Sequence, residues 1–362
     1  MTAVEPAGER YAALTAWNLP AFEIGAEILG SGGGGAPTAM ALVLADLLRE
    51  RDLPLIANAP DGTFASAIGA MGGPSIFAEC LPSGEEYRTA LGELEGLGLP
   101  RPEFVLCVEA AGMNGSYGAY LALHEGLGLL DGDLMGRALP RLEQTSLPSV
   151  PSMGPFVLVP PTGEVLLVDR AAPRGVERIM RAALPQCGGW GLFVTRPLSG
   201  PELGHCMIPG TVSRAIYLGV ALRRTSAYAR GPEMAEAIGG RLLGSGALEE
   251  IARYPSGGPN AGGNVHLRDT EGGFQVRLEF QNEYLLAAVD GEVVATCPDL
   301  LIVVDPRVRR FVRPEELRPR LDVAVIALPG PSWWKQTPAR LGLVGPRAFG
   351  IEHDYVDWVA AS

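Results

Sequence analysis

Two carboxylates follow the apolar, strand-like residues 128–130 near the middle of the chain. Asp131 and Asp133 stand two residues apart, and in an extended chain side chains at that spacing point the same way. Two adjacent carboxylates can share a proton or a divalent metal ion. The pattern predicts either a reactive acidic pair or an acidic loop in which Asp133 caps a turn and Arg137 balances its charge.

A third carboxylate, Glu109, comes directly after another apolar run, residues 104–108. Gly112 and Asn114 follow it. Small residues at the end of a buried strand let a ligand or another backbone segment come close. Glu109 is therefore either a third reactive carboxylate or a solvated charge at the end of a strand.

Four consecutive glycines, Gly32, Gly33, Gly34 and Gly35, precede an apolar segment that is typical of a helix. Glycine costs about 0.5–1 kcal/mol relative to alanine inside a helix or strand, so such a run favours a sharp bend or a close approach. Backbone N–H groups at the start of a helix suit an anion or a polarised carbonyl. We expect a loop that contacts a ligand, with a purely structural turn as the alternative.

The second half offers further polar candidates. Residues 276–284 alternate in polarity, which would place Asn282 on the apolar face of a strand, as a structural hydrogen-bond hub or a ligand contact. Glu283 would share the opposite, solvated face. Arg347 lies between Pro346 and Gly350 in a tight loop and is a candidate carboxylate anchor.

The cysteines do not form a metal or disulfide pattern. They are scattered and odd in number, and the His and Cys residues show no zinc-ligand spacing. We expect none of them to be a covalent nucleophile. The five residues are Cys80, Cys107, Cys187, Cys206 and Cys297.

The elements that must position these residues change character along the chain. Strand-like and helix-like segments alternate in the first part, which favours a mostly parallel α/β sheet with ligands at its strand ends. The second part has two helical stretches and then a β-rich series, which predicts an α+β domain. Expected strands are 53–57, 67–71, 104–108, 128–130, 273–286, 292–296, 300–304 and 323–328, and expected helices are 84–96, 115–126, 211–227 and 232–243.

Length and composition indicate two domains, 1–165 and 166–362. The net charge of −12 and the lack of a long basic cluster make nucleic acid an unexpected partner. No apolar run is long enough to cross a membrane, and no secretory leader is evident, so we expect a cytoplasmic protein. The chain could form a homo-oligomer.

Seven motifs, in order over nearly the whole chain, together resemble the S-methyl thiohydantoin desulfurase family, a hydantoinase-associated family first known only as a domain of unknown function. The chain departs from the family pattern after Glu109, where more glycine is expected. The resemblance implies the same two domains and an activity on a hydantoin-like ring. The motifs are LGSGGGG at 29–35, MGGP at 71–74, DGDLMGRALP at 131–140, GTVSRA at 210–215, FQNE at 280–283, ATCPDL at 295–300 and GPRAFG at 345–350.

We therefore expect a hydrolase that acts on a hydantoin-like or S-methyl thiohydantoin heterocycle and releases methanethiol. The alternatives are a ring-opening hydrolase or isomerase for hydantoins and a non-catalytic partner subunit of a hydantoinase. Asp131, Asp133 and Glu109 are the expected acid, base or ligands of a divalent metal. The residues expected to bind substrate are Gly32, Gly33, Gly34, Gly35, Asn114, Arg137, Asn282, Glu283 and Arg347.

Overall fold

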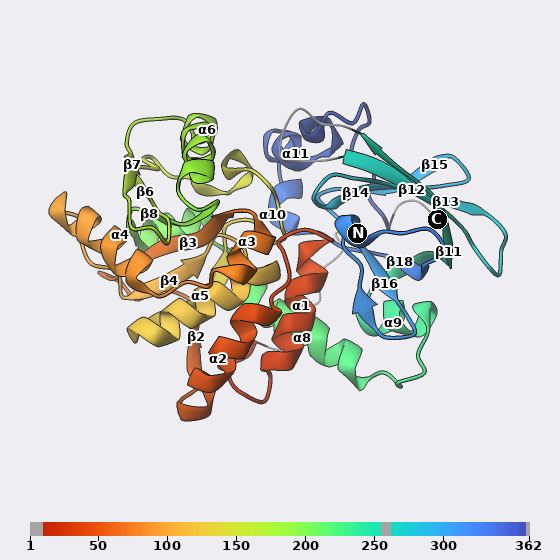
Figure 1. Ribbon diagram of the computed structural model, residues 1–362, viewed down its shortest axis with the longest axis horizontal. Helices are drawn as coiled ribbons and strands as arrows, with labels where there is room; N and C mark the ends of the chain where they lie inside the picture. The colour runs from red at the N-terminus through yellow and green to blue at the C-terminus, as the bar shows by residue number, and fades with distance from the viewer. Residues whose placement is uncertain (1–9, 255–261, 360–362) are drawn as a thin grey trace.

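The apolar runs of the first part form a parallel sheet core. They are rich in Leu, Ile, Val and Ala and are largely buried, as expected for strands covered by helices on both sides. Figure 1 shows the computed structural model, which describes residues 10–254 and 262–359. Four strands pair in parallel, in the order β2 (Leu53–Ile56), β5 (Gly128–Asp133), β4 (Phe104–Cys107) and β3 (Phe64–Gly72).

Antiparallel strands extend this core at both edges. The expected α/β class is confirmed, although the parallel pairing is limited to the four central strands. Strand β8 pairs antiparallel with both β3 and β6, so residues far along the chain complete the sheet. The added strands are β1 (Ala13–Leu14), β6 (Phe156–Val159), β7 (Leu166–Val168), β8 (Trp190–Thr195), β9 (Leu198–Ser199) and β10 (Ile208–Pro209).

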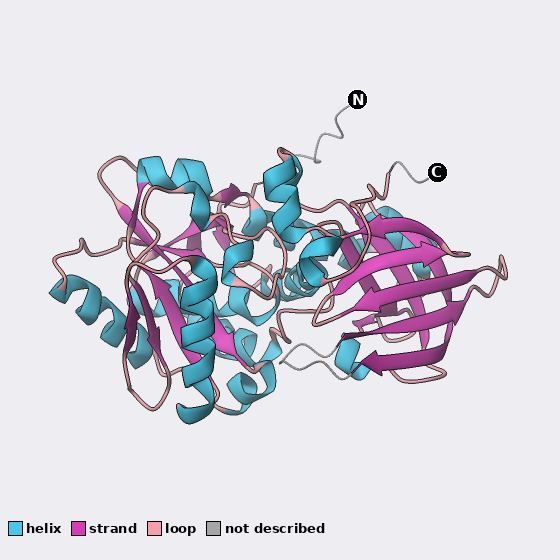
Figure 2. Cartoon of the chain, turned by 90° about the horizontal axis from the view of Figure 1, so that it is seen from above, coloured by secondary structure: helices cyan, strands magenta, loops and turns pink. Residues whose placement is uncertain are grey.

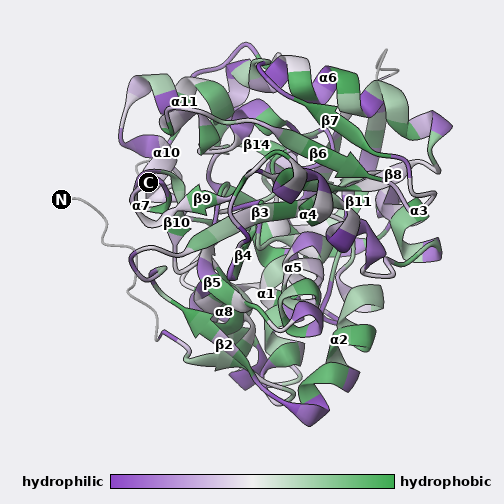
Figure 3. Ribbon diagram, turned by 90° about the vertical axis from the view of Figure 1, so that its left-hand side faces the viewer, coloured by the Kyte–Doolittle hydropathy of each residue, from purple (hydrophilic) through white to green (hydrophobic). Residues whose placement is uncertain are grey.

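Helices cover both faces of the first sheet. Several helices gather on one side of it, and α6 lies on the other (Figure 1). Figure 3 shows hydrophilic and hydrophobic residues alternating along α6, which buries only Val176 and Met180 among its side chains. The helices of this part are α1 (Leu19–Gly30), α2 (Thr38–Glu50), α3 (Pro74–Glu79), α4 (Glu85–Gly96), α5 (Gly112–Glu125), α6 (Pro173–Ala183), α7 (Gly200–Cys206) and α8 (Thr211–Arg224).

Helices α1 and α8 touch through their backbones. A Cβ atom built on Gly25 of α1 would lie 1.7 Å from the carbonyl oxygen of Ala215. One built on Gly219 of α8 would lie 1.8 Å from the carbonyl oxygen of Ala21. No larger residue fits at either glycine, so the two helices lie closer than side chains usually permit.

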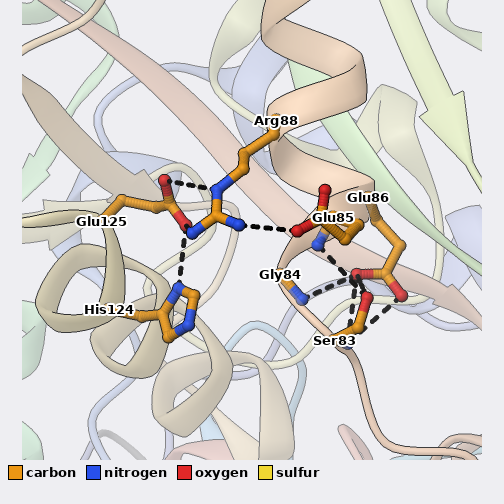
Figure 4. A network of polar contacts seen from close by, with 7 residues as sticks. All are labelled: Ser83, Gly84, Glu85, Glu86, Arg88, His124 and Glu125. Carbon is orange, nitrogen blue, oxygen red and sulfur yellow. Dashed lines mark hydrogen bonds and ion pairs between the residues drawn. The ribbon is translucent and has the colours of Figure 1, made fainter.

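A polar network joins the start of α4 to the end of α5 (Figure 4). Arg88 forms ion pairs with Glu85 at 2.6 Å and with Glu125 at 3.2 Å, and His124 Nδ1 lies 2.8 Å from Glu125 Oε1. The Glu86 carboxylate accepts a 3.0 Å hydrogen bond from the Gly84 N–H. These contacts join two helices that the sequence predicted: α4 lies within one residue of the expected 84–96, and α5 begins three residues before the expected 115–126.

The second sheet is entirely antiparallel and bends strongly (Figure 2). The long strand β11 pairs with β18 along its first half and with β12 along its second half, so both halves of the bent sheet face one apolar core. In sheet order the strands are β15 (Glu292–Thr296), β14 (Tyr284–Val289), β13 (Gln275–Phe280), β12 (Gly262–Arg268), β11 (Arg241–Tyr254), β18 (Asp322–Leu328), β16 (Leu300–Asp305) and β17 (Arg310–Phe311). The helices of this part are α9 (Gly231–Ala237), α10 (Ser332–Lys335) and α11 (Pro338–Val344).

Two expectations for the second part are wrong in detail. The helix expected at 232–243 ends at Ala237, because Gly239 adopts a positive φ of 69° and Arg241 already begins β11. The strand expected at 273–286 is a hairpin, with residues 281–283 as the turn between β13 and β14.

The division expected near residue 165 does not coincide with the division between the two sheets. Strands β7 to β10 and helix α8 all follow residue 165 and pack with the first sheet. The second sheet begins only at Arg241. Within the part of the chain that the structure describes, no helix combines the length and apolar character needed to span a bilayer.

Candidate functional site

A cleft of about 740 Å³ lies where the ends of the first-sheet strands meet the second sheet. Its walls come from the glycine loop, the end of β3, the β4–α5 turn, the loop after β5, helix α6 and the β13–β14 turn. The polar and glycine residues of its lining include Gly32, Gly33, Gly34, Gly35, Glu109, Asn114, Arg141, Arg181, Arg253, Gln281, Asn282 and Glu283.

The glycine loop connects α1 to α2, and each of its glycines faces a close neighbour. A Cβ atom on Gly33 would lie 2.4 Å from Glu283 Oε1, and one on Gly32 would lie 2.8 Å from the ring of Tyr284. One on Gly34 would lie 3.2 Å from the Cα atom of Gly112. The run therefore lets the β13–β14 turn and the β4–α5 turn pack directly on the backbone of the loop.

Hydrogen bonds fix the same loop to the second sheet. The Ser31 hydroxyl donates to the carbonyl of Leu301 at 2.8 Å, and the Tyr284 N–H donates to the carbonyl of Ser31 at 2.8 Å. The Gly33 N–H donates to the carbonyl of Gly30 at 2.8 Å. At Gly33 the neighbour of the loop is therefore the Glu283 carboxyl group, and the Gly33 N–H is already engaged by Gly30.

Glu109 lies on the cleft wall in the turn between β4 and α5. Its Oε1 accepts a 2.7 Å hydrogen bond from Asn114 Nδ2, and its Oε2 accepts one of 3.3 Å from the Leu139 N–H. The orientation of Asn114 is fixed because its Oδ1 accepts from the Ala70 N–H at 2.7 Å. Burial raises the pKa of Glu109 to about 8, against the opposing effect of these hydrogen bonds.

Glu283 enters the cleft from the opposite side, in the β13–β14 turn. It is 3% exposed, and its Oε2 has no hydrogen-bond partner. Burial raises the pKa of Glu283 to about 7, and the charge of Arg137 opposes that rise. Glu283 is not on a solvated strand face, because the chain turns after Phe280 and the turn packs on the glycine loop. Asn282, its neighbour in this turn, also lines the cleft rather than a strand face.

Asp131 and Asp133 do not line the cleft. Asp131 Oδ1 accepts from the Ser213 N–H at 2.8 Å and Oδ2 from the Ser213 hydroxyl at 2.7 Å, at the start of α8. Asp133 accepts from the N–H groups of Ala110 at 2.7 Å and Gly136 at 2.6 Å. Each aspartate thus has its own hydrogen-bond partners, and Asp133 fixes the turn that carries Glu109.

Arg137 and Arg347 also lie outside the cleft lining. Arg137 is fully buried behind it and donates to the carbonyl of Asp299 at 2.7 Å. Arg347 is 61% exposed and pairs with Asp354 at 2.8 Å. The cationic side chains that do line the cleft, Arg141, Arg181 and Arg253, are isolated in the sequence, and no local pattern distinguished them.

Among its described residues, the cleft lining includes neither a metal-ligand cluster nor a cysteine. No group of three His, Cys, Asp or Glu side chains able to hold a metal ion occurs within residues 10–254 and 262–359. Burial raises the pKa values of the Cys206 and Cys297 thiols to about 12, which leaves both protonated at neutral pH. None of the five cysteines lines the cleft.

The fold and the cleft together define a two-domain α/β protein with two buried carboxyl groups beside a glycine loop. The family model described as S-Me-THD-like, N-terminal domain, matches residues 17–170, and S-Me-THD-like, C-terminal domain, matches residues 171–358. The chain therefore belongs to the S-Me-THD-like family, and the resemblance carried by the seven motifs is confirmed.

A solved structure shares the fold. The chain is similar to the crystal structure of a protein from Chromobacterium violaceum, with a TM-score of 0.79 and 23% sequence identity. The match covers 96% of this chain and 99% of the other. A comparison with curated proteins found no significant match.

Proposed function

We propose that this protein hydrolyses an S-methyl thiohydantoin ring to the corresponding hydantoin and methanethiol. Family membership supports the ring class. The observation that carries the proposal is the pair of buried carboxyl groups, Glu109 and Glu283, that enter one cleft from different domains with pKa values of about 8 and about 7.

Glu283 acts as the base and Glu109 as the acid in the addition step. At neutral pH the group with the lower pKa is the more ionised, so Glu283 takes a proton from water while the water oxygen bonds to the ring carbon that bears the methylthio group. Glu109 gives its proton to the ring nitrogen of the C=N bond. The product is a neutral tetrahedral adduct.

The second step returns Glu283 to its ionised state and Glu109 to its protonated state. The adduct's hydroxyl loses its proton to the Glu109 carboxylate as the carbonyl forms. The carbon–sulfur bond breaks, and the sulfur takes the proton from Glu283 and leaves as methanethiol. Each such proton transfer by a positioned group is typically worth about 10²–10⁴-fold in rate.

Neutral groups of the cleft orient the ring in this proposal. Asn114 holds Glu109 through its amide, and Asn282 faces the ring from the β13–β14 turn. The glycine loop contributes a surface without side chains, so a flat ring can lie on its backbone. The proposal uses the two carboxyl groups alone, since within residues 10–254 and 262–359 they do not belong to a group of three His, Cys, Asp or Glu side chains able to hold a metal ion.

The test is turnover of S-methyl thiohydantoins by the purified protein. Methanethiol is measured with a thiol reagent and the ring product by mass spectrometry. We expect Glu109→Gln and Glu283→Gln each to lower kcat by at least about 100-fold. Glu86→Gln is the matched control, since Glu86 is a buried glutamate of the first domain that lies outside the cleft.

The products distinguish the alternatives. Ring opening without methanethiol would replace the proposal with a ring-opening hydrolase. Lack of turnover by the wild-type protein for every S-methyl thiohydantoin and hydantoin tried, together with binding to a hydantoinase, would favour a partner subunit.

A further inference from the structure

A buried cationic atom behind the cleft and a buried carboxyl oxygen in its lining both lack hydrogen-bond partners. Among the polar side chains that the structure describes, Arg137 Nη2 and Glu283 Oε2 are both inaccessible to water and make no hydrogen bond. Arg137 is 0% exposed and Glu283 is 3% exposed. Buried polar atoms without partners are uncommon in folded proteins, and each usually has a functional or structural reason.

The charge of Arg137 is not neutralised where its side chain is anchored. Its Nε donates to the carbonyl of Ala138 at 3.1 Å and its Nη1 to the carbonyl of Asp299 at 2.7 Å. The Asp299 carboxylate is engaged elsewhere, with Lys335 Nζ at 2.5 Å and the Tyr355 hydroxyl at 2.7 Å. In the described part of the chain, no carboxylate oxygen forms an ion pair with Arg137.

The acidic groups around Arg137 are Cys297, Glu283, Asp299 and Glu109. Cys297 is a protonated thiol at neutral pH, since burial raises its pKa to about 12. The Asp299 carboxylate pairs with Lys335. Two carboxyl groups then remain to balance the buried guanidinium, and these are the two that line the cleft.

The influence of Arg137 on these two groups is unequal. Its charge is the strongest cationic influence on Glu283, followed by Arg181 of α6 and Arg141 of the loop after β5. The charge of Glu283 affects the pKa of Arg137 more strongly than the charge of Glu109 does. Around Glu109 the main charged neighbours are carboxylic, Glu283 and Asp133, so ionisation is opposed there.

We propose that Arg137 is a positioning residue of the cleft: its buried guanidinium keeps Glu283 ionised while Glu109 stays protonated. Charges interact strongly where water is excluded. Glu283 has a buried oxygen without a partner, whereas both oxygens of Glu109 accept hydrogen bonds, so the charge of Arg137 acts chiefly on Glu283. Glu283 therefore ionises first, and its negative charge then holds Glu109 neutral. This inference rests on the proposed function for its catalytic meaning. Its physical content, the order in which the two groups ionise, does not depend on turnover.

The experiment is a pH titration of ¹³Cδ-glutamate-labelled full-length protein by NMR, with the two signals assigned from Glu109→Gln and Glu283→Gln. In the wild type, Glu283 ionises at lower pH than Glu109. In Arg137→Gln, the midpoint of Glu283 rises by at least about one pH unit, a tenfold change in proton affinity. Arg137→Lys keeps the charge and restores part of the shift.

Arg309→Gln is the matched control. The Arg309 guanidinium also donates to backbone carbonyls, including that of Ser226 at 2.8 Å, but Arg309 is not among the charges that act on Glu283. Its loss can lower the melting temperature but leaves the Glu283 midpoint unchanged. On the activity side, Arg137→Gln moves the acid limb of kcat/KM to higher pH, which a merely structural arginine would not do.

Two results overturn the proposal. One is a wild-type titration in which Glu109 ionises before Glu283, which needs no arginine variant and so holds even if Arg137→Gln fails to fold. The other is an unchanged Glu283 midpoint in a folded Arg137→Gln protein. If the order of ionisation is as expected but thiohydantoins are not hydrolysed, the proposed function fails and the role of Arg137 stands.

Discussion

Glu109 and Glu283 are unusual because each carboxyl group is poised to change its charge near neutral pH. Burial raises their pKa values to about 8 and about 7, far above those of solvent-exposed glutamates. An acid or base is most effective when its pKa lies near the working pH. Two carboxyl groups with different pKa values can hold one proton between them, so that one is ionised and the other protonated. Addition of water to a C=N bond requires such a base and such an acid.

The pH dependence of the reaction follows from these values. The base Glu283 must be ionised, so kcat/KM rises as the pH increases through about 7. The acid Glu109 must be protonated, so kcat/KM falls as the pH increases through about 8. We expect a narrow bell with its maximum between these values, measured as initial rates of methanethiol release. A profile that is flat from pH 6 to 9 would contradict this assignment.

Sequence reasoning found one of the two carboxyl groups for the right physical reason. Glu109 follows a buried strand, and strand ends of a parallel sheet meet at one edge. Glu283 was expected to bind substrate, but from a solvated strand face, because alternation continued past Phe280; tertiary contacts, including that with Gly33, make the turn buried instead. The catalytic roles suggested for Asp131 and Asp133 stay predictions, and neither side chain lines the cleft.

At the scale of elements, the glycine loop is a joint between domains. Its conformation is set by what packs on it from both sheets, and each of the four glycines gives space to a different neighbour. Local sequence indicated that something must come close to this backbone. It could not indicate that one of these neighbours is the β13–β14 turn, which lies about 250 residues further along the chain.

Substitution at Gly33 tests this reading. The added methyl group of Gly33→Ala would overlap Glu283 Oε1, at 2.4 Å, so we expect the carboxyl group to be displaced and kcat/KM to fall by at least about tenfold. Gly30→Ala is the matched control, because a Cβ atom there meets nothing within 4 Å and Gly30 ends helix α1. Its stability, measured by thermal melting, should be unchanged or higher by up to about 1 kcal/mol.

A Gly33→Ala protein with normal turnover would show that the Glu283 carboxyl group can move without loss of function. An equal fall in kcat/KM in Gly33→Ala and Gly30→Ala would instead show that the effect arises at the end of helix α1.

The helices and strands differ in how well the sequence predicted them. Helix α4 is bounded by glycine, and its predicted limits lie within one residue of those observed. The antiparallel strands β6 to β8 were not anticipated within the first sheet, because their pairing with β3 depends on contacts far apart in the chain. Short-range patterns therefore identified local elements well and sheet membership poorly.

At the scale of the whole molecule, the domain boundary suggested by the sequence and the boundary between the two sheets lie at different places in the chain. The two family models meet at residues 170 and 171, yet the first sheet needs β8 to pair with both β3 and β6. Helix α8 also covers α1. A fragment cut near residue 165 would expose an unpaired strand edge and a bare helix face.

This predicts how fragments fold. Residues 1–165 should show no cooperative thermal transition by circular dichroism, whereas residues 1–230, which retain β8 and α8, should show one. Both fragments keep the same N-terminal region, so the comparison isolates the contribution of residues 166–230. A cooperative transition in the shorter fragment would establish 1–165 as an autonomous domain.

The backbone contact between α1 and α8 has a mechanical consequence. At Gly25 and Gly219 no side chains separate the backbones of α1 and α8. Neither helix can therefore rotate against the other without a clash, and the two move as one rigid body. One end of that body reaches the second sheet through Ser31 and the other through Arg309. Because this helix pair is attached at both ends, it holds the two sheets at a fixed separation. We therefore expect the cleft to keep a constant width when substrate binds rather than to close around it.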